Sequence, residues 1–315
     1  MKALVTGGAG FIGSHIAQTL ASKGATVLVL DDFSSGDRQK LAWDAGHDAV
    51  EVIEGDAGNE DLLAKIVPGC EWVFHEAAVA SVPQSVAQPL ETNRQNLDAT
   101  LKLLVASRNA GVNRFVFASS SAIYGNSDSV AKRESDAPAP VTPYGLQKYA
   151  GERYAQLFHQ LYGLPTVALR YFNVFGPRQS FDSPYSGVIA RFCTSMLRGE
   201  APVIFGDGGQ SRDFIFIDNI VQANLLVAEA PAELVAGQVF NAGCGQSITL
   251  KQLVADINDL TGQHLVPRHE PARTGDIRHS QADIAALRHA TGFDPQVSWK
   301  DGLAQTLEFY RQQPV

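Results

Sequence analysis

Residues 2–13 read KALVTGGAGFIG, and this stretch decides the fold class. A short β-branched run leads into a turn with glycines at Gly7, Gly10 and Gly13, and an apolar helical pattern follows over 11–23. Glycines permit a tight turn and let the start of a helix approach a phosphate group closely. The stretch therefore predicts a strand–turn–helix unit that binds a dinucleotide pyrophosphate.

The same alternation of apolar runs and helical patterns continues through the first 170 residues. The apolar runs are nearly continuous, which is typical of strands buried on both faces of a sheet. We therefore expect an α/β fold with a Rossmann-like, doubly wound parallel sheet. Strands are predicted at 2–6, 26–30, 50–54, 71–78, 114–119 and 166–170, and helices near 11–23, 90–110 and 143–162.

Glycine and proline become frequent after about residue 171, and the helical patterns near 186–198 and 249–260 are joined by long loops. We expect an NAD-binding domain over 1–170, with a strand (239–243) and a helix near 213–241 returning to it. The remaining residues, 171–212 and 242–315, are predicted to form a smaller lobe that binds the substrate. The polar stretch 126–141 is expected to be a mobile loop over the site.

Composition excludes several classes of protein. The 315 residues carry a formal net charge of −8, which argues against a nucleic-acid partner. The three cysteines are scattered, and the histidines include no HExxH motif, so neither disulfides nor a metal site is expected. With no signal peptide and no apolar run long enough to span a bilayer, we expect no membrane contact and a cytoplasmic location.

Two acidic residues, Asp31 and Asp32, end the second predicted strand. A carboxylate there accepts hydrogen bonds from a ribose diol and repels a 2′-phosphate, which favours NAD over NADP as the cofactor. The alternative is a structural turn followed by a solvated acid. Asp56, after the third strand, either reaches the adenine in the same way or caps the strand end.

A phenol and an ammonium lie four residues apart in VTPYGLQKYA, residues 141–150. Thr142 is a plausible N-cap and Pro143 a plausible first helical residue, so Tyr144 and Lys148 would share one helix face. The ammonium, together with the positive ring of NAD⁺, would lower the pKa of the phenol and make it a usable base. By itself the spacing is common on helix surfaces.

A third group comes from FASSSAIYG, residues 117–125, which leaves a predicted strand at its carboxyl end. Ligands of doubly wound sheets bind at that edge. Three consecutive serines are costly to bury there unless each is hydrogen-bonded. Serine, tyrosine and lysine in this order, downstream of the glycine-rich turn, therefore indicate a catalytic group.

With these motifs in order, the chain resembles the extended short-chain dehydrogenase/reductases, and among them the nucleotide-sugar 4-epimerases. The matching stretches are TGGAGFIG (6–13), HEAA (75–78), NLDAT (96–100), SSSAIYG (119–125), YGLQK (144–148), RYFNVFGPRQ (170–179), RDFIFIDN (212–219) and RTGDIRHS (273–280). The resemblance implies that Ser120 is the catalytic hydroxyl and Tyr144 the base, while Lys148 holds the nicotinamide ribose and tunes the tyrosine.

The resemblance also implies a set of NAD-binding residues along the carboxyl edge of the sheet. They are Gly7, Gly10, Phe11, Ile12, Gly13, Asp31, Asp32, Ser35, Gly36, Asp56, Ala57, Ala77, Ala78, Asn96, Tyr144, Lys148 and Tyr171.

Two arginines, Arg212 and Arg273, lie in the predicted second lobe, and guanidinium groups suit phosphate oxygens. In similar epimerases these positions grip the nucleotide diphosphate; alternatively each pairs with a neighbouring acid such as Asp213 or Asp276. The full set of substrate-binding residues implied by the resemblance is Ala80, Ser81, Ser120, Ser121, Asn173, Gln179, Gly187, Val188, Arg212, Arg273, Asp276 and Ser280.

The family also contains dehydratases and decarboxylases, which place acidic residues after the catalytic hydroxyl. This chain has Ser121 and Ala122 there, which favours an epimerase that inverts C4 of a UDP-hexose. The small Ser280, with Ala80, Ser121 and Gly187 around it and Gln179 as a hydrogen-bonding partner, is expected to admit an N-acetyl group. The alternative is that the small residues reflect loop packing alone. The alternatives are a UDP-glucuronate 4-epimerase, a net reductase or dehydrogenase, and a non-catalytic NAD sensor. A homodimer is implied by the resemblance.

Overall fold

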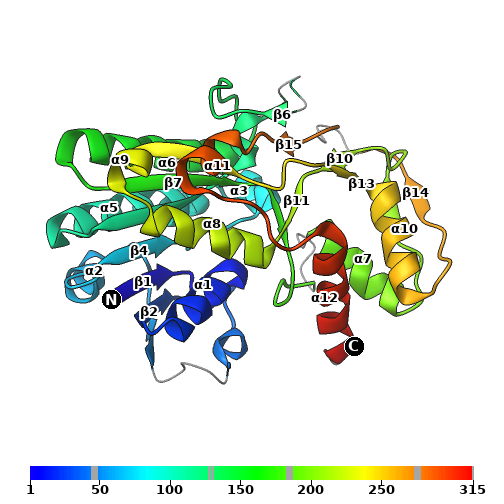
Figure 1. Ribbon diagram of the computed structural model, residues 1–315, viewed down its shortest axis with the longest axis horizontal. Coiled ribbons are helices and arrows are strands. Elements are labelled where there is room, and N and C mark those ends of the chain that lie inside the picture. The colour runs from blue at the N-terminus through cyan, green and yellow to red at the C-terminus, as the bar shows by residue number, and fades with distance from the viewer. Residues whose placement is uncertain (44–48, 127–128, 130, 182–186, 273–277, 314–315) are drawn as a thin grey trace.

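The computed structural model describes residues 1–43, 49–126, 129, 131–181, 187–272 and 278–313, and its centre is a seven-stranded parallel sheet (Figure 1). The order β12-β7-β5-β4-β1-β2-β3 confirms the predicted doubly wound arrangement and the return of a late strand to the sheet. The strands are β1 (Lys2–Thr6), β2 (Thr26–Asp31), β3 (Val50–Glu54), β4 (Trp72–His75), β5 (Arg114–Ser120), β7 (Thr166–Tyr171) and β12 (Gln238–Ala242).

Helices cover both faces of the sheet, and each face has its own apolar cluster. Along β1, Ala3 and Val5 face one cluster while Leu4 faces the other, as the two-residue period of a strand requires. This burial on both sides explains the continuous apolar runs. The helices α1 (Phe11–Ser22) and α8 (Ile217–Glu229) pack together on one face; α2 (Glu60–Ile66), α5 (Ala99–Ala110) and α6 (Pro143–Tyr162) pack together on the other.

Two predicted elements differ from the observed ones. The strand predicted at 71–78 ends at His75, because the next residues turn toward the glycine-rich loop and the Glu76 amide donates to the Thr6 carbonyl. The helix predicted at 90–110 is interrupted by a π-helical turn, Arg94–Asp98, between α4 (Pro89–Asn93) and α5. That turn directs Asn96 at Val79 and Gln147, which the regular period does not foresee.

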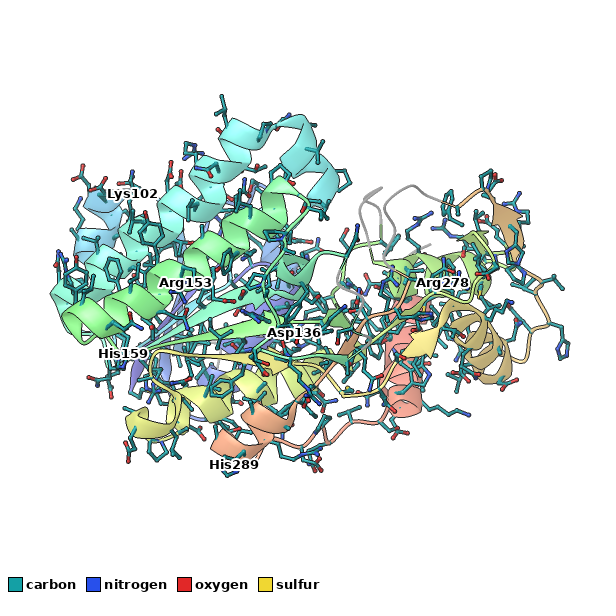
Figure 2. The ribbon with its side chains drawn as sticks, turned by 90° about the horizontal axis from the view of Figure 1, so that it is seen from above. Lys102, Asp136, Arg153, His159, Arg278 and His289 are labelled. Carbon is teal, nitrogen blue, oxygen red and sulfur yellow. The ribbon has the colours of Figure 1, made fainter. Side chains whose placement is uncertain are left out.

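The sequence predicts a mobile loop over 126–141, but the described part of this segment is held by a strand pairing and by hydrogen bonds. Ala131–Lys132 (β6) pairs with Gln281–Ala282 (β15). The Asn241 side chain donates to the carbonyls of Lys132 and Asp283 at 2.9 and 3.1 Å. In Figure 2 the labelled Asp136 of this segment lies between the sheet and the group of elements that includes Arg278. The segment therefore joins the two sides of the molecule.

A second group of elements lies beside the sheet, on the side of the C-terminus and opposite the N-terminus (Figure 1). The division into an NAD-binding domain and a smaller lobe stays a prediction. This group contains α7 (Val188–Leu197), α10 (Leu250–Thr261), α12 (Trp299–Gln312), β9 (Val203–Phe205), β10 (Ser211–Arg212), β13 (Ile248–Thr249) and β14 (Arg268–Glu270). The remaining elements are α3 (Val82–Ala87), β8 (Asn173–Phe175), β11 (Phe214–Phe216), α9 (Ala232–Val235) and α11 (Ala285–Thr291), with 3₁₀ turns at Arg38–Leu41 and Ser121–Tyr124.

No helix among the described residues combines the length and the apolar character needed to cross a membrane.

Candidate active site

The glycine-rich turn lies between β1 and α1 and packs directly against the end of β4. Gly7 has a φ of 65°, and a Cβ there would lie 2.7 Å from the Ala77 amide nitrogen. A Cβ at Gly13 would overlap the carbonyl oxygen of Gly7. Helix α1 starts after Gly10 without a side-chain cap, so its first amide groups are available to an anion. Phe11 and Ile12 are its first residues.

The two carboxylates after β2 have different surroundings. The oxygens of Asp31 accept the Ala9 and Phe33 amides, each at 2.9 Å, so this side chain borders the glycine-rich turn. Burial raises the pKa of Asp31. Asp32 is exposed and caps a local turn by accepting the Ser34 amide and hydroxyl. Of the two predicted positions, only Asp31 has the geometry to meet a ribose held against α1.

The other predicted NAD residues follow the same edge of the sheet. Gly36 packs so closely on Asp31 that a Cβ would lie 2.5 Å from its oxygen. The Asp56 carboxylate accepts the Gly58 amide and an Arg94 nitrogen, both at 2.7 Å, so it caps the end of β3. Asn96 accepts the Val79 amide at 2.7 Å. Ser35 is exposed, Ala57 is buried, and Ala77 and Ala78 are half-buried.

Helix α6 carries the tyrosine and the lysine, and it begins as predicted. The Thr142 hydroxyl accepts the Gly145 amide at 3.2 Å, and Pro143 is the first helical residue. Lys148 is buried, and its Nζ donates to the Ala118 carbonyl of β5 at 2.8 Å. Gly145 and Gly151 allow this contact, because a Cβ at either position would lie 2.7–2.8 Å from Phe117 or the Ala122 carbonyl.

The serines at the end of β5 have separate partners. Ser119 is buried and donates to Glu152 at 2.9 Å, whereas Ser120 lies within hydrogen-bonding reach of the Tyr144 phenol. Ser121 begins the 3₁₀ turn that follows. The predicted grouping of Ser120, Tyr144 and Lys148 is therefore present at the carboxyl edge of the sheet.

The phenol of Tyr144 is in a buried environment next to Ser120. Burial raises its pKa, since a phenolate loses hydration there; Ser120 opposes this shift and Glu76 adds to it. Burial also lowers the pKa of Lys148 to about 8, and Glu76 acts in the opposite direction. The lowering of the Tyr144 pKa by the Lys148 ammonium and the positive ring of NAD⁺ stays a prediction.

The predicted substrate residues lie on segments that the fold brings to one side of this centre. The Ser280 amide donates to the Ser211 carbonyl at 3.2 Å, which places the buried Ser280 next to the strand that carries Arg212. The Asn173 amide donates to the Asp213 carbonyl at 3.0 Å, so Asn173 lies beside the same segment.

Gln179 and Gly187 also lie together, since a Cβ at Gly187 would lie 3.0 Å from the Gln179 amide nitrogen. Val188 begins α7 after Gly187. Ala80 is exposed, and Ser81 caps α3 by accepting the Gln84 amide at 3.2 Å. Arg273 and Asp276 lie outside the described residues.

Two polar groups of the site were missed by the sequence reasoning. Asp213 is fully buried and accepts the amides of Cys244, Gly245 and Ala282 at 2.8–3.0 Å. Burial raises the pKa of this carboxyl to about 6. Glu76, within HEAA, accepts from or donates to the Tyr171 hydroxyl at 2.8 Å. The available signal for Asp213 was its position directly after Arg212. Nothing in the sequence around Glu76 indicated its role.

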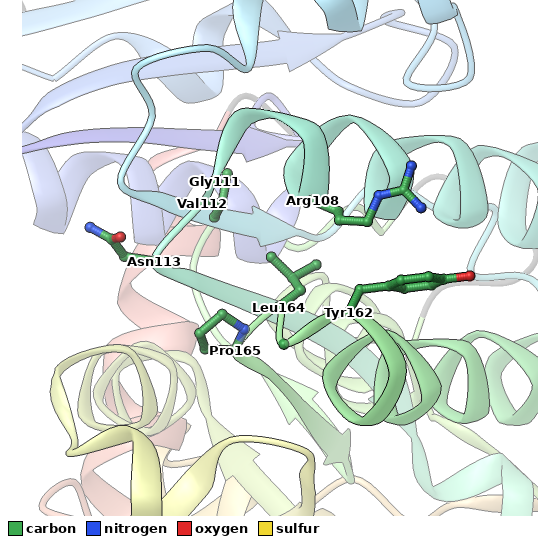
Figure 3. Close-up of a pocket in the computed structure, with 8 residues that line it drawn as sticks. Arg108, Gly111, Val112, Asn113, Tyr162, Leu164 and Pro165 are labelled. Carbon is green, nitrogen blue, oxygen red and sulfur yellow. The ribbon is translucent and has the colours of Figure 1, made fainter.

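Figure 3 shows a hollow at the opposite end of the strands, where β5 and β7 begin. It is lined by residues that precede β5 and β7, among them Asn113 and Pro165. The Arg108 guanidinium lies over the Tyr162 ring, 4.8 Å from its centroid. Because ligands of parallel sheets bind at the carboxyl edge, this hollow belongs to the helix–strand connections.

Most of the chain, including residues of all seven strands of the large sheet, matches a known family model. Residues 3–243 match the NAD dependent epimerase/dehydratase family. The chain belongs to this family. Its sequence is 38% identical over 315 residues to a UDP-glucose 4-epimerase of Mycolicibacterium smegmatis, covering 99% of both chains.

Solved structures of similar proteins agree with the fold. A UDP-N-acetylglucosamine 4-epimerase from Methanobrevibacter ruminantium, in complex with UDP-N-acetylmuramic acid, superposes with a TM-score of 0.94 at 42% identity. A UDP-glucose 4-epimerase from Thermotoga maritima, with UDP-glucose, gives 0.93 at 40% identity. Each comparison covers 99% of both chains.

The chain is therefore an enzyme of this family, and its cofactor is NAD; several similar structures contain NAD. The residues present fit that cofactor, because the uncapped start of α1 suits the pyrophosphate and Asp31 suits an unphosphorylated ribose. The relatives differ in chemistry. They include a UDP-N-acetyl-alpha-D-glucosaminuronate decarboxylase of Bacillus cytotoxicus at 30% identity and a dTDP-glucose 4,6-dehydratase of Streptomyces niveus at 33%.

Replacing Gly13 with Ala should weaken NAD binding, because the added methyl group collides with the Gly7 carbonyl and opens the turn. We expect the dissociation constant to rise by roughly tenfold or more. Isothermal titration of protein stripped of nucleotide measures it. Ser22→Ala is the control, since Ser22 is exposed at the far end of the same helix. Equal affinity of Gly13→Ala and Ser22→Ala would contradict the assignment.

Proposed function

We propose that this chain is an NAD-dependent epimerase that inverts C4 of a UDP-hexose through a 4-keto intermediate. The observation that carries the proposal is the meeting of Ser120, Tyr144 and Lys148 beside the glycine-rich turn, without an acidic residue at Ser121 or Ala122. The substrates proposed are UDP-glucose and UDP-galactose, together with their N-acetyl counterparts.

In this mechanism the side chains of the site move one proton and position the sugar. NAD supplies a hydride acceptor and donor when it is bound. Tyr144 removes the proton of the sugar 4-hydroxyl as the C4 hydrogen leaves, and Ser120 holds the same oxygen by a hydrogen bond. Lys148 lies one helical turn from Tyr144, and its positive charge favours the phenolate. Tyr144 later returns the proton when the other face of the keto sugar accepts the hydride.

The keto sugar must remain bound while it turns. We propose that Arg212 and Arg273 hold the diphosphate, with Asn173 beside them and Asp276 on the nucleoside. The anchoring of Asp213 by backbone amides supports this role for Arg212, because it fixes the strand on which the arginine lies. A fixed diphosphate and a free hexose would allow the sugar to present either face to the site.

Other reactions of the family are less consistent with the site. Dehydration needs a general acid to expel water, and serine and alanine at 121 and 122 supply none. A net reductase or dehydrogenase would use the same Tyr144 but consume cofactor stoichiometrically. UDP-glucuronate is a further substrate candidate, and chromatographic separation of its 4-epimers would test it.

A homodimer is also proposed, through the exposed face of α6. Leu146, Tyr154, Leu157 and Leu161 have exposed fractions of 57%, 37%, 38% and 66%. Their spacing keeps them near one face of the helix, and a contiguous apolar face of this kind is typical of a protein interface. Val86 and Leu90, on α3 and α4, are exposed at 62% and 88%.

Replacing Tyr144 with Phe should abolish the epimerisation while leaving NAD bound, because only the hydroxyl that moves the proton is lost. We expect kcat to fall by about 10²–10⁴. Products from UDP-glucose and UDP-N-acetylglucosamine are separated by chromatography, and bound NAD is extracted and measured. Unaltered turnover in the variant, or no interconversion of either sugar pair by the wild type, would refute the proposed function.

Replacing Ser280 with Tyr should suppress the N-acetyl reaction selectively, since a large side chain would fill the space proposed for the acetamido group. We expect kcat/KM for UDP-N-acetylglucosamine to fall by roughly 10–200-fold relative to UDP-glucose. Ser280→Ala, which keeps the residue small, is the control. If both substrates lose activity equally, the assignment of this pocket fails.

The double substitution Leu157→Glu and Leu161→Glu should give a monomer, because it places buried charges in the proposed interface. Sedimentation equilibrium measures the mass in solution. Leu260→Glu on α10 is the control, since Leu260 has the same 38% exposure as Leu157 but lies on another face of the molecule. A monomeric wild type, or a dimeric double variant, would rule out this interface.

A further inference from the structure

Glu76 is an acidic residue at the active centre that the proposed mechanism does not use. It follows β4 and is half-buried, and its Oε1 lies 2.8 Å from the hydroxyl of Tyr171 on β7. The same hydroxyl lies 2.9 Å from Oδ1 of Asn224 on α8. Three oxygen atoms thus form a chain: carboxyl, phenol and amide.

Proton counting in this chain gives a definite answer. Asn224 Nδ2 donates to the Ile220 carbonyl at 2.9 Å, which fixes the amide with Oδ1 toward Tyr171. An amide oxygen can only accept, and the phenol has one proton to give. A separate hydrogen bond at each of the two contacts needs two protons, and Glu76 is the group that can carry the second one. With Glu76 protonated, the carboxyl donates to Tyr171 and Tyr171 donates to Asn224.

The charged groups around Glu76 agree with this arrangement. Among the described residues, no lysine, arginine or histidine forms an ion pair with Glu76. From α6 it faces Tyr144 and Lys148, and the Lys148 ammonium is directed at the Ala118 carbonyl and not at a carboxylate. From β7 it meets the neutral Tyr171 phenol, which in turn contacts the Asn224 amide of α8.

His75, the preceding residue and the last of β4, has its ring between the hydroxyls of Thr6 and Thr100 at 2.7 and 2.8 Å. Burial lowers the pKa of His75 to about 3, so it is neutral and adds no charge near Glu76.

We propose that Glu76 is a positioning residue, held as a neutral carboxylic acid by the Tyr171–Asn224 chain, so that the Lys148 ammonium acts on Tyr144 without an opposing charge. This inference rests on the proposed role of Tyr144 as the base. It assigns to the second residue of HEAA a role that the sequence pattern did not suggest.

The proposal predicts a specific dependence on pH. Burial raises the pKa of Glu76 to about 7, while the charge of Lys148 acts in the opposite direction. Below that pH the carboxyl is neutral; above it, the carboxylate disfavours the Tyr144 phenolate and raises the pKa of the base. The kcat of the wild type should therefore increase less with pH than the kcat of a variant without this carboxylate.

Glu76→Gln is the decisive variant, since its amide nitrogen donates to Tyr171 as the protonated acid does, and it cannot ionise. The ratio of kcat of Glu76→Gln to that of the wild type should rise by about tenfold between about pH 6 and about pH 9. Glu134→Gln is the control, because Glu134 is also half-buried with a raised pKa but does not act on Tyr144 or Lys148. A ratio independent of pH would overturn the proposal.

Infrared spectroscopy of the NAD-bound full chain tests the protonation directly and needs no turnover. At about pH 6 the wild type should show a carbonyl band of a protonated carboxyl group that shifts in heavy water and is absent from Glu76→Gln. Tyr171→Phe should shift this band, because the acid loses its acceptor. No such band in the wild type would refute the neutral acid. If neither UDP-sugar is epimerised, the proposed function fails while this result still decides the state of Glu76.

Discussion

The close approach of α6 to β5 is the constraint on which the active centre depends. Lys148 reaches the Ala118 carbonyl at 2.8 Å, and its ammonium lies 5.1 Å from the centroid of the Phe117 ring. An ammonium is seldom buried without a carboxylate, because its loss of hydration is expensive. A carbonyl and an aromatic face compensate part of that cost and leave the charge to act on Tyr144. Glycines at 145 and 151 make the spacing possible.

A buried polar network holds the same helix in register from the other side. Glu152 of α6 binds Arg170 of β7 at 2.7 Å, and both side chains are at most 4% exposed. Arg170 also donates to the Tyr124 hydroxyl at 2.8 Å, and Tyr124 donates to Asn241 at 2.6 Å. Every member has a partner, which is the condition under which such a network gives a unique arrangement. Because Asn241 also binds the carbonyls of Lys132 and Asp283, the network extends from the catalytic helix to the substrate side.

The sequence predicted the parts of this molecule that depend on local patterns. Continuous apolar runs identified the strands of the sheet, and Thr142-Pro143 located the start of α6, because buried strands and helix caps have short-range signatures. The π-helical turn at Arg94–Asp98 and the pairing of β6 with β15 escaped prediction. The turn is stabilised by bonds from Asn96 to Val79 and Gln147, and the pairing joins segments 150 residues apart, so neither leaves a periodic trace.

The difference between local patterns and contacts of distant segments also explains which site residues the sequence could predict. Tyr144 and Lys148 are four residues apart on one helix, whereas the meaning of Glu76 depends on Tyr171 and Asn224, which lie 95 and 148 residues further along the chain. Asp213 likewise binds amides 31 and 69 residues away. A carboxyl group in a sequence carries no sign of whether it will meet a cation, a backbone amide or another oxygen. Its charge state is therefore a property of the fold, and at this centre it decides how strongly one lysine acts on one tyrosine.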